Sequence, residues 1–144
     1  MSLPRVKIFY ENGAIGGAEP QEDGITGVVA NGVAVVDGMQ LGTMYLLTKL
    51  ADLTDIGVTS ADADANAHVY KQVKEFYDTA PSGTNLYLMA FADTVTLTDM
   101  LDVTNEYAKK LVDAANGKIR TLFVVRKEAV GYTPTLVDAL DGDV

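Results

Sequence analysis

Two short apolar runs constrain the fold of this chain most strongly. NLYLMAF occupies residues 85–91 and IRTLFVV occupies residues 119–125, and each has the length of one strand. A run that is apolar at nearly every position is typical of a strand covered on both faces. We therefore expect two buried strands in a sheet that carries helices on its faces.

The residues before the first of these runs predict the clearest helix, within residues 62–83. Its apolar residues recur at helical spacing and form one stripe: Val69, Val73, Phe76, Tyr77 and Ala80. Pro81 and Gly83 end the helix. We expect Val73 and Phe76 to be buried against the sheet, together with Leu88 of the first apolar run.

A second long helix is expected to begin near Thr96, where Asp99 stands three residues later as in a capping box. It would end at Asn116-Gly117. The side chains that it would bury are Met100, Leu101, Tyr107, Ala108, Leu111, Val112 and Ala115.

The remaining elements complete an alternation of strands and helices. Residues 25–30 and 33–36 are β-rich and flank Asn31-Gly32, a strong signal for a two-residue hairpin turn. Residues 43–47 predict a buried strand that leads into a short helix ending at Gly57, and residues 133–144 predict the opening of a further helix. This order indicates a single α/β domain with a mixed, mainly parallel sheet flanked by helices.

The glycine-rich stretch ENGAIGGAEPQEDG, residues 11–24, has the composition of a phosphate-binding loop but not its chemistry. A Walker loop needs Lys and Ser or Thr directly after its last glycine, whereas Gly17 is followed by Ala18, Glu19 and Pro20. Pro20 also interrupts the helix start that a dinucleotide loop requires. The acids of this stretch would repel a phosphate. We interpret it as a turn.

Two further features resemble sites only partly. DADAN begins like a calcium loop at Asp62, Asp64 and Asn66, but Ala67 and Val73 replace the glycine and glutamate that the loop needs. These residues are more typical of a helix cap. No metal site is expected, and the purified domain should bind no nucleotide, flavin or calcium.

His68, the only histidine, lies beside the apolar stripe of its helix and is interpreted as structural. Neighbouring aspartates are interpreted as a solvated acidic face rather than as general acids; these pairs are Asp52 and Asp55, Asp99 and Asp102, and Asp141 and Asp143. No catalytic residue and no cofactor-binding residue is therefore predicted.

Composition limits the partners. The chain has 144 residues, of which 11 are Lys or Arg and 20 are Asp or Glu, so its net charge is −9. This acidity argues against binding to nucleic acid or to an anionic membrane surface. Cysteine is absent, which excludes disulfides and thiolate chemistry. No apolar stretch approaches the length of a membrane span, and a soluble protein is the simplest expectation.

Four stretches, taken together, resemble the tail sheath proteins of contractile bacteriophages and related contractile injection systems. In these proteins a short strand leads into a segment of the pattern xLaDaxxlGI, followed by a helix with a histidine and paired aromatic residues and by PxGxxLyLM. The resemblance covers about residues 11–140. The matching stretches are ENGAIGGAEPQEDGITGVVANG (11–32), YLLTKLADLTDIGVT (45–59), HVYKQVKEFYDTAPSGTNLYLMAF (68–91) and GKIRTLFVV (117–125).

The resemblance implies a non-enzymatic structural subunit that assembles into a helical tube around an inner tail tube. Its partners would be other copies of itself and the inner tail tube protein, with no nucleic acid and no membrane. It would be located in the tail of a virion or phage-like particle and be assembled in the bacterial cytoplasm. Family members are usually longer, so the chain is interpreted as the N-terminal part of such a subunit, either truncated or a short relative.

Terminal extensions of sheath proteins add strands to the sheets of neighbouring subunits. The resemblance therefore implies that residues 1–10 form an extended arm and that residues 11–144 form the sheath-like domain. The assembly residues of the arm would be Val6, Ile8, Phe9 and Tyr10. The same segment, with Pro4, Arg5 and Lys7, also fits an ordinary protected sheet edge.

Two other functions stay open. A small flavodoxin-like enzyme or nucleotide-binding domain would have its site at the carboxyl ends of the strands, with its best candidates in residues 92–95. An adaptor or interaction domain without sheath function is the second alternative.

Overall fold

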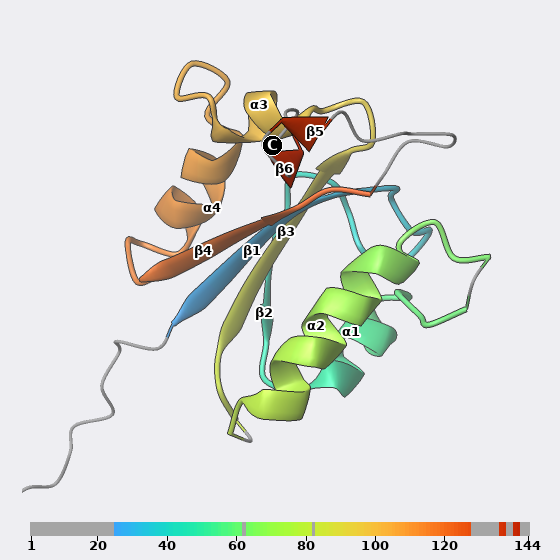
Figure 1. Cartoon of the computed structure of the whole chain (residues 1–144). Coiled ribbons are helices and arrows are strands. Elements are labelled where there is room, and N and C mark those ends of the chain that lie inside the picture. Colours follow the sequence, from blue (N-terminus) through green and yellow to red (C-terminus); the bar gives the residue numbers. More distant parts are fainter. Residues whose placement is uncertain (1–24, 62, 82, 128–135, 138–139, 142–144) are drawn as a thin grey trace, which may run out of the picture.

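The computed structural model describes residues 25–61, 63–81, 83–127, 136–137 and 140–141. Four strands form one mixed sheet in the order β2-β3-β1-β4 (Figure 1). Strands β1 (Thr26–Gly32), β3 (Leu86–Ala92) and β4 (Thr121–Val125) run parallel, and β2 (Met44–Leu47) runs antiparallel to β3. The expected α/β domain with a mixed, mainly parallel sheet is confirmed.

Helices cover both faces of this sheet. One face packs against α1 (Leu50–Asp55) and α2 (Ala67–Thr79), and the other packs against α3 (Leu97–Leu101) and α4 (Tyr107–Ala114). Figure 1 shows the two pairs on opposite sides of the strands. The chain passes from β1 through β2, α1 and α2 to β3, and then through α3 and α4 to β4 on the far side of β1.

The side chains of the two central strands alternate between two separate cores. Val28 of β1 and Leu88 of β3 lie in the core under α1 and α2, whereas Val29 and Met89 lie in the core under α3 and α4. Every residue of β1 and all of β3 except Ala92 are buried. Residues 86–91, the apolar part of the run at residues 85–91, are thus covered on both faces, as the composition predicts.

Helix α2 also follows its prediction closely. Val69 and Val73 are fully buried, while Phe76 and Tyr77 are half-buried and pack edge to face with ring centroids 5.1 Å apart. Phe76 is therefore less buried than expected. The short helix α1 ends as predicted, and Gly57 after it has φ +81°, a conformation that favours glycine.

The hairpin expected at Asn31-Gly32 is wrong. Both residues continue β1, where Asn31 pairs with Phe91 and Gly32 with Ala92 in parallel register, and residues 33–36 form no strand. The signal failed because partners distant in sequence hold Asn31 and Gly32 in an extended strand.

The single helix expected from Thr96 to Ala115 is also wrong, because it is two helices. The capping box of Thr96 and Asp99 is present, but α3 ends at Leu101, and Glu106 takes the left-handed conformation before α4. Asp102 accepts a hydrogen bond from the Thr104 amide at 3.1 Å, a local bond that competes with helix continuation. As a result Leu101 is 58% exposed rather than buried.

Three further predictions are wrong in part. The strands at residues 43–47 and 119–125 are expected from the sequence to be buried, and residues 133–144 are expected to begin a helix. Strands β2 and β4 form at the expected places but at the edges of the described sheet, where Leu46 is 49% and Phe123 54% exposed. The described residues of the last segment form an antiparallel pair, β5 (Leu136–Val137) and β6 (Leu140–Asp141), instead of a helix. Thr and Val in that segment favour strands. A helix of this length would form too few hydrogen bonds to offset the unfavourable free energy of nucleation.

Candidate functional site

The assembly residues Val6, Ile8, Phe9 and Tyr10 lie outside the described residues, as does the glycine-rich stretch 11–24. The arm and the turn stay predictions. In the described part of the chain, polar side chains form hydrogen bonds at the carboxyl end of β1 and around the starts of the helices.

A network of buried amides lies at the carboxyl end of β1. Asn31 is 3% exposed. Its Nδ2 donates to Asp93 Oδ1 at 3.3 Å, its Oδ1 accepts from the Lys127 backbone amide at 2.7 Å, and its carbonyl contacts His68 Nε2 at 2.8 Å. The side chain of Asn31 thereby joins β1 to the residues that follow β3 and β4, and its main-chain carbonyl joins β1 to α2.

Asn66, the residue before α2, extends this network. It is 2% exposed, its Oδ1 accepts from the Val33 amide, and its Nδ2 donates to the Val33 carbonyl, both at 2.9 Å. The side-chain amide of Asn66 thus forms two hydrogen bonds with the Val33 backbone, one as acceptor and one as donor, as the backbone of a neighbouring strand would. Gly32 makes room for it, because a Cβ there would lie 2.6 Å from Asn66 Oδ1.

His68 is held by its Nε2, which must carry the proton to donate to the Asn31 carbonyl. Its Nδ1 is buried and has no hydrogen-bond partner among the described residues. The bonded partner of the ring is a main-chain carbonyl, not a carboxylate or a hydroxyl, so this contact orients no nucleophile.

Residues 92–95, the candidate site of a flavodoxin-like enzyme, form a tight turn in which the Val95 amide donates to the Ala92 carbonyl at 2.9 Å. Asp93 in this turn accepts from Asn31. Polar groups do gather at the carboxyl ends of the parallel strands, where such enzymes bind ligands. Their hydrogen bonds, however, go to one another.

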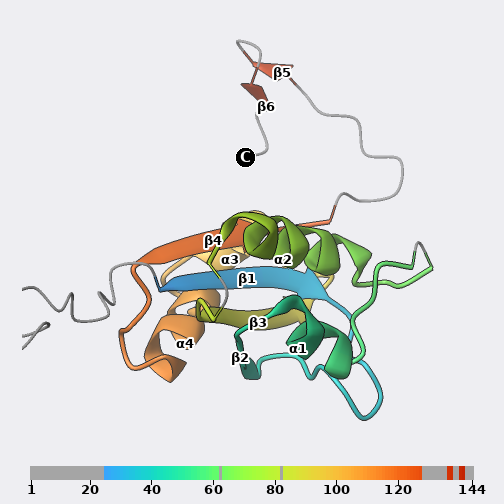
Figure 2. The same ribbon diagram turned by 90° about the horizontal axis from the view of Figure 1, so that it is seen from below.

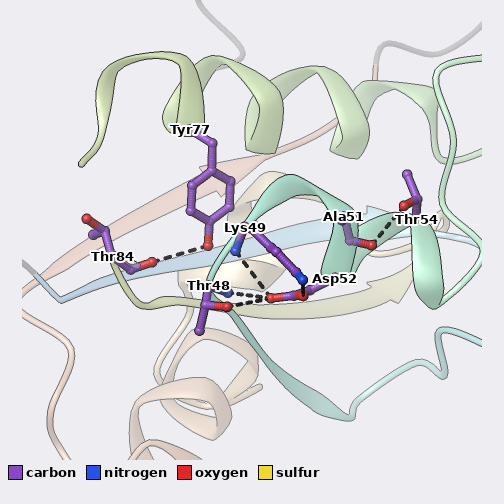
Figure 3. Close-up of polar contacts among 7 residues, drawn as sticks. All are labelled: Thr48, Lys49, Ala51, Asp52, Thr54, Tyr77 and Thr84. Atoms are coloured by element: carbon purple, nitrogen blue, oxygen red, sulfur yellow. Dashed lines mark hydrogen bonds and ion pairs between the residues drawn. The ribbon is translucent and has the colours of Figure 1, made fainter. Parts of the chain in front are cut away.

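Aspartates in the first turns of α1 and α3 cap these helices. Asp52 Oδ2 accepts from the Thr48 amide at 2.7 Å, from the Thr48 hydroxyl at 2.8 Å and from the Lys49 amide at 3.2 Å (Figure 3). The hydrogen bonds from Thr48 hold the pKa of Asp52 below its usual value. Asp99 does the same at Thr96, whose hydroxyl lies 2.7 Å away and lowers the pKa of Asp99.

Asp64 fixes the turn before α2 rather than the helix itself. It accepts from the Thr59 amide at 2.7 Å and from the Asn66 amide at 2.8 Å. Burial alone would raise the pKa of Asp64, but these hydrogen bonds outweigh it and keep the pKa below 3.8. Asp64 and Asn66 of the DADAN motif are thus bonded to protein groups, and Asp62 lies outside the described residues.

Figure 3 also shows how α2 is tied to the strand that follows it. The Tyr77 hydroxyl donates to the Thr84 carbonyl at 3.3 Å, and burial of the ring raises the pKa of Tyr77 to about 12. Tyr77 is therefore neutral at physiological pH and serves as a donor.

One open depression of about 410 Å³ lies beside α2. Its lining residues are Ser60, Ala67, His68, Tyr70, Lys71 and Lys74. Lys71 lies 3.9 Å from Glu75, and Lys74 bonds Asp78, so each lysine already has an acidic partner. The depression shows no unsatisfied charge that would select an anion.

Two negative observations apply to the described residues alone. Nowhere in them do three or more His, Asp or Glu side chains cluster in a way that could hold a metal ion. Among the helices of this part of the chain, none is both long and apolar enough to cross a membrane.

Sequence reasoning missed Asn31 and Asn66 as structural centres. The only available signal was an asparagine at the end of an apolar run. Because glycine follows it, Asn31 is interpreted from the sequence as part of a hairpin turn. The bonding partners of Asn31 are 37, 62 and 96 residues away, so no local pattern could reveal them.

Fold and site together define a small α/β domain whose mixed sheet is flanked by helices and whose described polar residues mainly support the fold. A family model described as "DUF2586, N-terminal domain" matches residues 3–139. The match covers nearly the whole chain, so the chain belongs to this family. No curated protein and no solved structure matches it. The family description names no activity.

Proposed function

We propose that the chain is a structural subunit, or the N-terminal part of one, of a contractile tail sheath. Its copies would assemble into a helical tube around an inner tail tube, in a virion or phage-like particle. The four matching sequence stretches support this proposal. The described parts of these stretches lie in one α/β domain, which is compatible with the proposal.

The observation that carries the proposal is how the polar side chains are used. Asp52 and Asp99 are engaged in helix caps, Asp64 is engaged in the turn before α2, and His68 contacts the Asn31 carbonyl through Nε2. The sheet, by contrast, has two uncovered edges in its described part, β2 and β4. Uncovered edges suit a protein that functions by pairing with other chains.

The arm is the part of the proposal that an experiment can address directly. We propose that residues 1–10 pair with a neighbouring subunit through Val6, Ile8, Phe9 and Tyr10. An isolated strand cannot satisfy its backbone groups, and main-chain pairing with an open sheet edge satisfies them.

The test is deletion of residues 1–10 from the full-length gene product, followed by electron microscopy of the purified protein. The undeleted protein should form tubes, alone or with the inner tail tube protein. The deletion should abolish tubes while the melting temperature of the domain stays nearly unchanged. If the deletion unfolds the domain, the segment is an internal strand and the arm assignment is wrong.

The enzyme alternative has one observation in its favour, namely the polar residues at the carboxyl ends of β1 and β3. Calorimetric titration with ATP, FMN and calcium separates it from the sheath proposal. The sheath proposal predicts no heat of binding. A micromolar dissociation constant for any of the three would favour the enzyme.

A further inference from the structure

The dipeptide Asn-Gly, in which asparagine is chemically least stable, occurs twice in the described residues. Asn31-Gly32 ends β1, and Asn116-Gly117 follows α4. A further copy, Asn12-Gly13, lies outside the described residues. Because glycine has no Cβ, its main-chain nitrogen approaches the side-chain amide of the preceding asparagine with little hindrance. The two described copies therefore present the same chemistry in two structural settings.

The reaction of an Asn-Gly sequence is deamidation through a cyclic imide. The glycine nitrogen attacks Cγ of the asparagine, so that an N–Cγ bond forms, the Cγ–Nδ2 bond breaks, and ammonia leaves with the proton of the glycine amide. Water then opens the imide at either carbonyl and yields aspartate or isoaspartate, the latter with one additional carbon in the main chain. The rate depends on how freely the two residues reach the geometry of attack and on the access of water.

At Asn31 the fold opposes each of these requirements. Asn31 is 3% exposed, and its side-chain amide is held at both ends, by the Lys127 amide at 2.7 Å and by Asp93 at 3.3 Å. The main chain of Asn31 and Gly32 is extended in parallel register with β3. Attack on Cγ would require the side chain to lose both hydrogen bonds and the end of β1 to leave the sheet.

Asn116-Gly117 lies in an exposed turn instead. Both residues are exposed and take positive φ angles, 53° for Asn116 and 69° for Gly117. In the described part of the chain the Asn116 side chain forms no hydrogen bond. The Gly117 nitrogen donates to the Val112 carbonyl at 3.0 Å. Attack therefore requires one hydrogen bond at a helix end to open, and helix ends open locally at little cost.

The two dipeptides also differ in their position in the domain. Strand β1 lies between β3 and β4, whereas the turn from α4 to β4 lies at the margin of the domain (Figure 2). Opening of a strand that is paired on both sides requires much of the domain to unfold, whereas a marginal turn opens by itself. The surroundings of each dipeptide therefore determine which of the two reacts.

The product has different consequences at the two sites. Conversion of Asn31 replaces the Nδ2 donor by a carboxylate oxygen, 3.3 Å from Asp93 Oδ1, where two like charges repel each other. Isoaspartate would also insert a main-chain carbon into the register of β1 with β3. At Asn116 the new carboxylate is exposed to solvent, so the native fold tolerates it.

We propose that the folded chain is deamidated at Asn116, that the sheet protects Asn31, and that deamidation of Asn31 in the unfolded chain prevents its return to the native fold. A covalent change in one dipeptide thereby makes prolonged unfolding irreversible. This inference concerns the chemistry of the chain and does not depend on the proposed sheath function.

The test compares the unchanged full chain in buffer and in guanidinium chloride at the same mildly alkaline pH. Digestion with pepsin at low pH, where deamidation is slow, and fragmentation mass spectrometry read each asparagine separately. In the denatured chain Asn31 and Asn116 should react at rates within about threefold of each other, because the dipeptide is the same. In the folded chain Asn31 should react at least about a hundredfold more slowly than in the denatured chain, whereas Asn116 should stay within about tenfold of its denatured rate.

A pair of variants tests the cause of the protection. Asp93→Ala removes the acceptor of Asn31 Nδ2 and should accelerate the reaction of Asn31 in the folded chain by about tenfold. Asp93→Asn is the matched control, because it keeps an acceptor oxygen, and it should change this rate by no more than about threefold. The rate at Asn116 is the internal control in both variants. Circular dichroism checks that each variant folds, and the comparison of the folded with the denatured unchanged chain needs no variant.

Refolding tests the consequence. A denatured sample that is partly deamidated is refolded, and the native molecules are separated by size-exclusion chromatography. Molecules modified at Asn31 should be depleted from the native fraction by about tenfold or more, whereas those modified at Asn116 should be recovered in it. The variants Asn31→Asp and Asn116→Asp provide the same comparison without the reaction.

Three results would overturn the inference. One is a rate at Asn31 in the folded chain that is less than about a hundredfold below its denatured rate. Another is an Asn116 that the folded chain protects as strongly as Asn31. The last is recovery of molecules modified at Asn31 in the native fraction as often as those modified at Asn116.

Discussion

Strands β3 and β4 belong to the same sheet, but only β3 is paired on both edges and covered on both faces. β3 lies between β2 and β1 and buries six of its seven residues, whereas β4 pairs with β1 alone in the described chain and leaves Phe123 exposed. Contacts within the domain therefore satisfy both backbone edges of β3 and cover its side chains. In the described chain, the edge strand therefore leaves one side of its backbone and part of its apolar surface uncovered, which is the feature that the proposed function uses.

The largest effect is expected at the central strand. Leu88 is fully buried under α1 and α2, and Leu88→Ala removes its packing and leaves a cavity. We expect a loss of about 3 kcal/mol in the free energy of unfolding. Chemical denaturation measures it through the midpoint, and an unchanged midpoint would show that β3 is not the centre of the core.

A somewhat smaller effect is expected where β1 ends. Asn66→Ala removes both hydrogen bonds to the Val33 backbone and leaves its amide and carbonyl without this partner. We expect a cost of about 2 kcal/mol. Asn66→Asp is the matched variant, because it retains the acceptor for the Val33 amide but loses the donor. Because this variant also buries a negative charge opposite the Val33 carbonyl, it should cost at least as much stability as Asn66→Ala at neutral pH. An unchanged denaturation midpoint for either variant would contradict the pairing.

The pH dependence of stability tests the turn that positions Asn66. The folded-state pKa of Asp64 lies below 3.8, so its contribution is complete above the unfolded pKa and is lost as the pH falls through the folded pKa. Asp64→Asn removes the carboxylate and therefore removes its pH-dependent contribution to the free energy of unfolding. Between about pH 5 and about pH 2, the unchanged chain should lose more stability than Asp64→Asn. Parallel curves would show that the hydrogen bonds from Thr59 and Asn66 do not hold the carboxylate.

The smallest effect is expected at the edge. Phe123→Ala removes a ring that is 54% exposed, so the isolated chain should lose no more than about 1 kcal/mol of stability. The difference between the stability losses of Phe123→Ala and Leu88→Ala measures how differently the domain covers β4 and β3. A loss as large as that of Leu88→Ala would mean that Phe123 is covered by the chain itself.

The central elements could be predicted from the sequence because their signals are local. The period of the α2 stripe and the continuous apolarity of residues 85–91 depend only on neighbouring residues, and both predictions are confirmed. The positions of strands within the sheet could not be predicted in this way. Residues 119–125 are nearly as apolar as residues 85–91, and only the long-range order of the sheet places them at its edge.

The errors have the same origin. Asn31-Gly32 has the local chemistry of a turn, but Asp93, Lys127 and His68 hold it in a strand through contacts 37 to 96 residues apart. The break between α3 and α4 and the strands at residues 136–141 depend on hydrogen bonds that periodicity does not register. For the candidate site, the caps at Thr96 and Asp99 could be predicted, whereas the network around Asn31 could not.

Amide hydrogen exchange before and after assembly tests the central claim most directly, that β4 is an open edge used for assembly. The account predicts that in the dissociated chain the amides of β3 exchange slowly and those on the outer side of β4 exchange fast. On assembly the β4 amides should become protected, while the β3 amides change little. Equal protection of β4 and β3 in the dissociated chain, or no gain at β4 on assembly, would contradict the account.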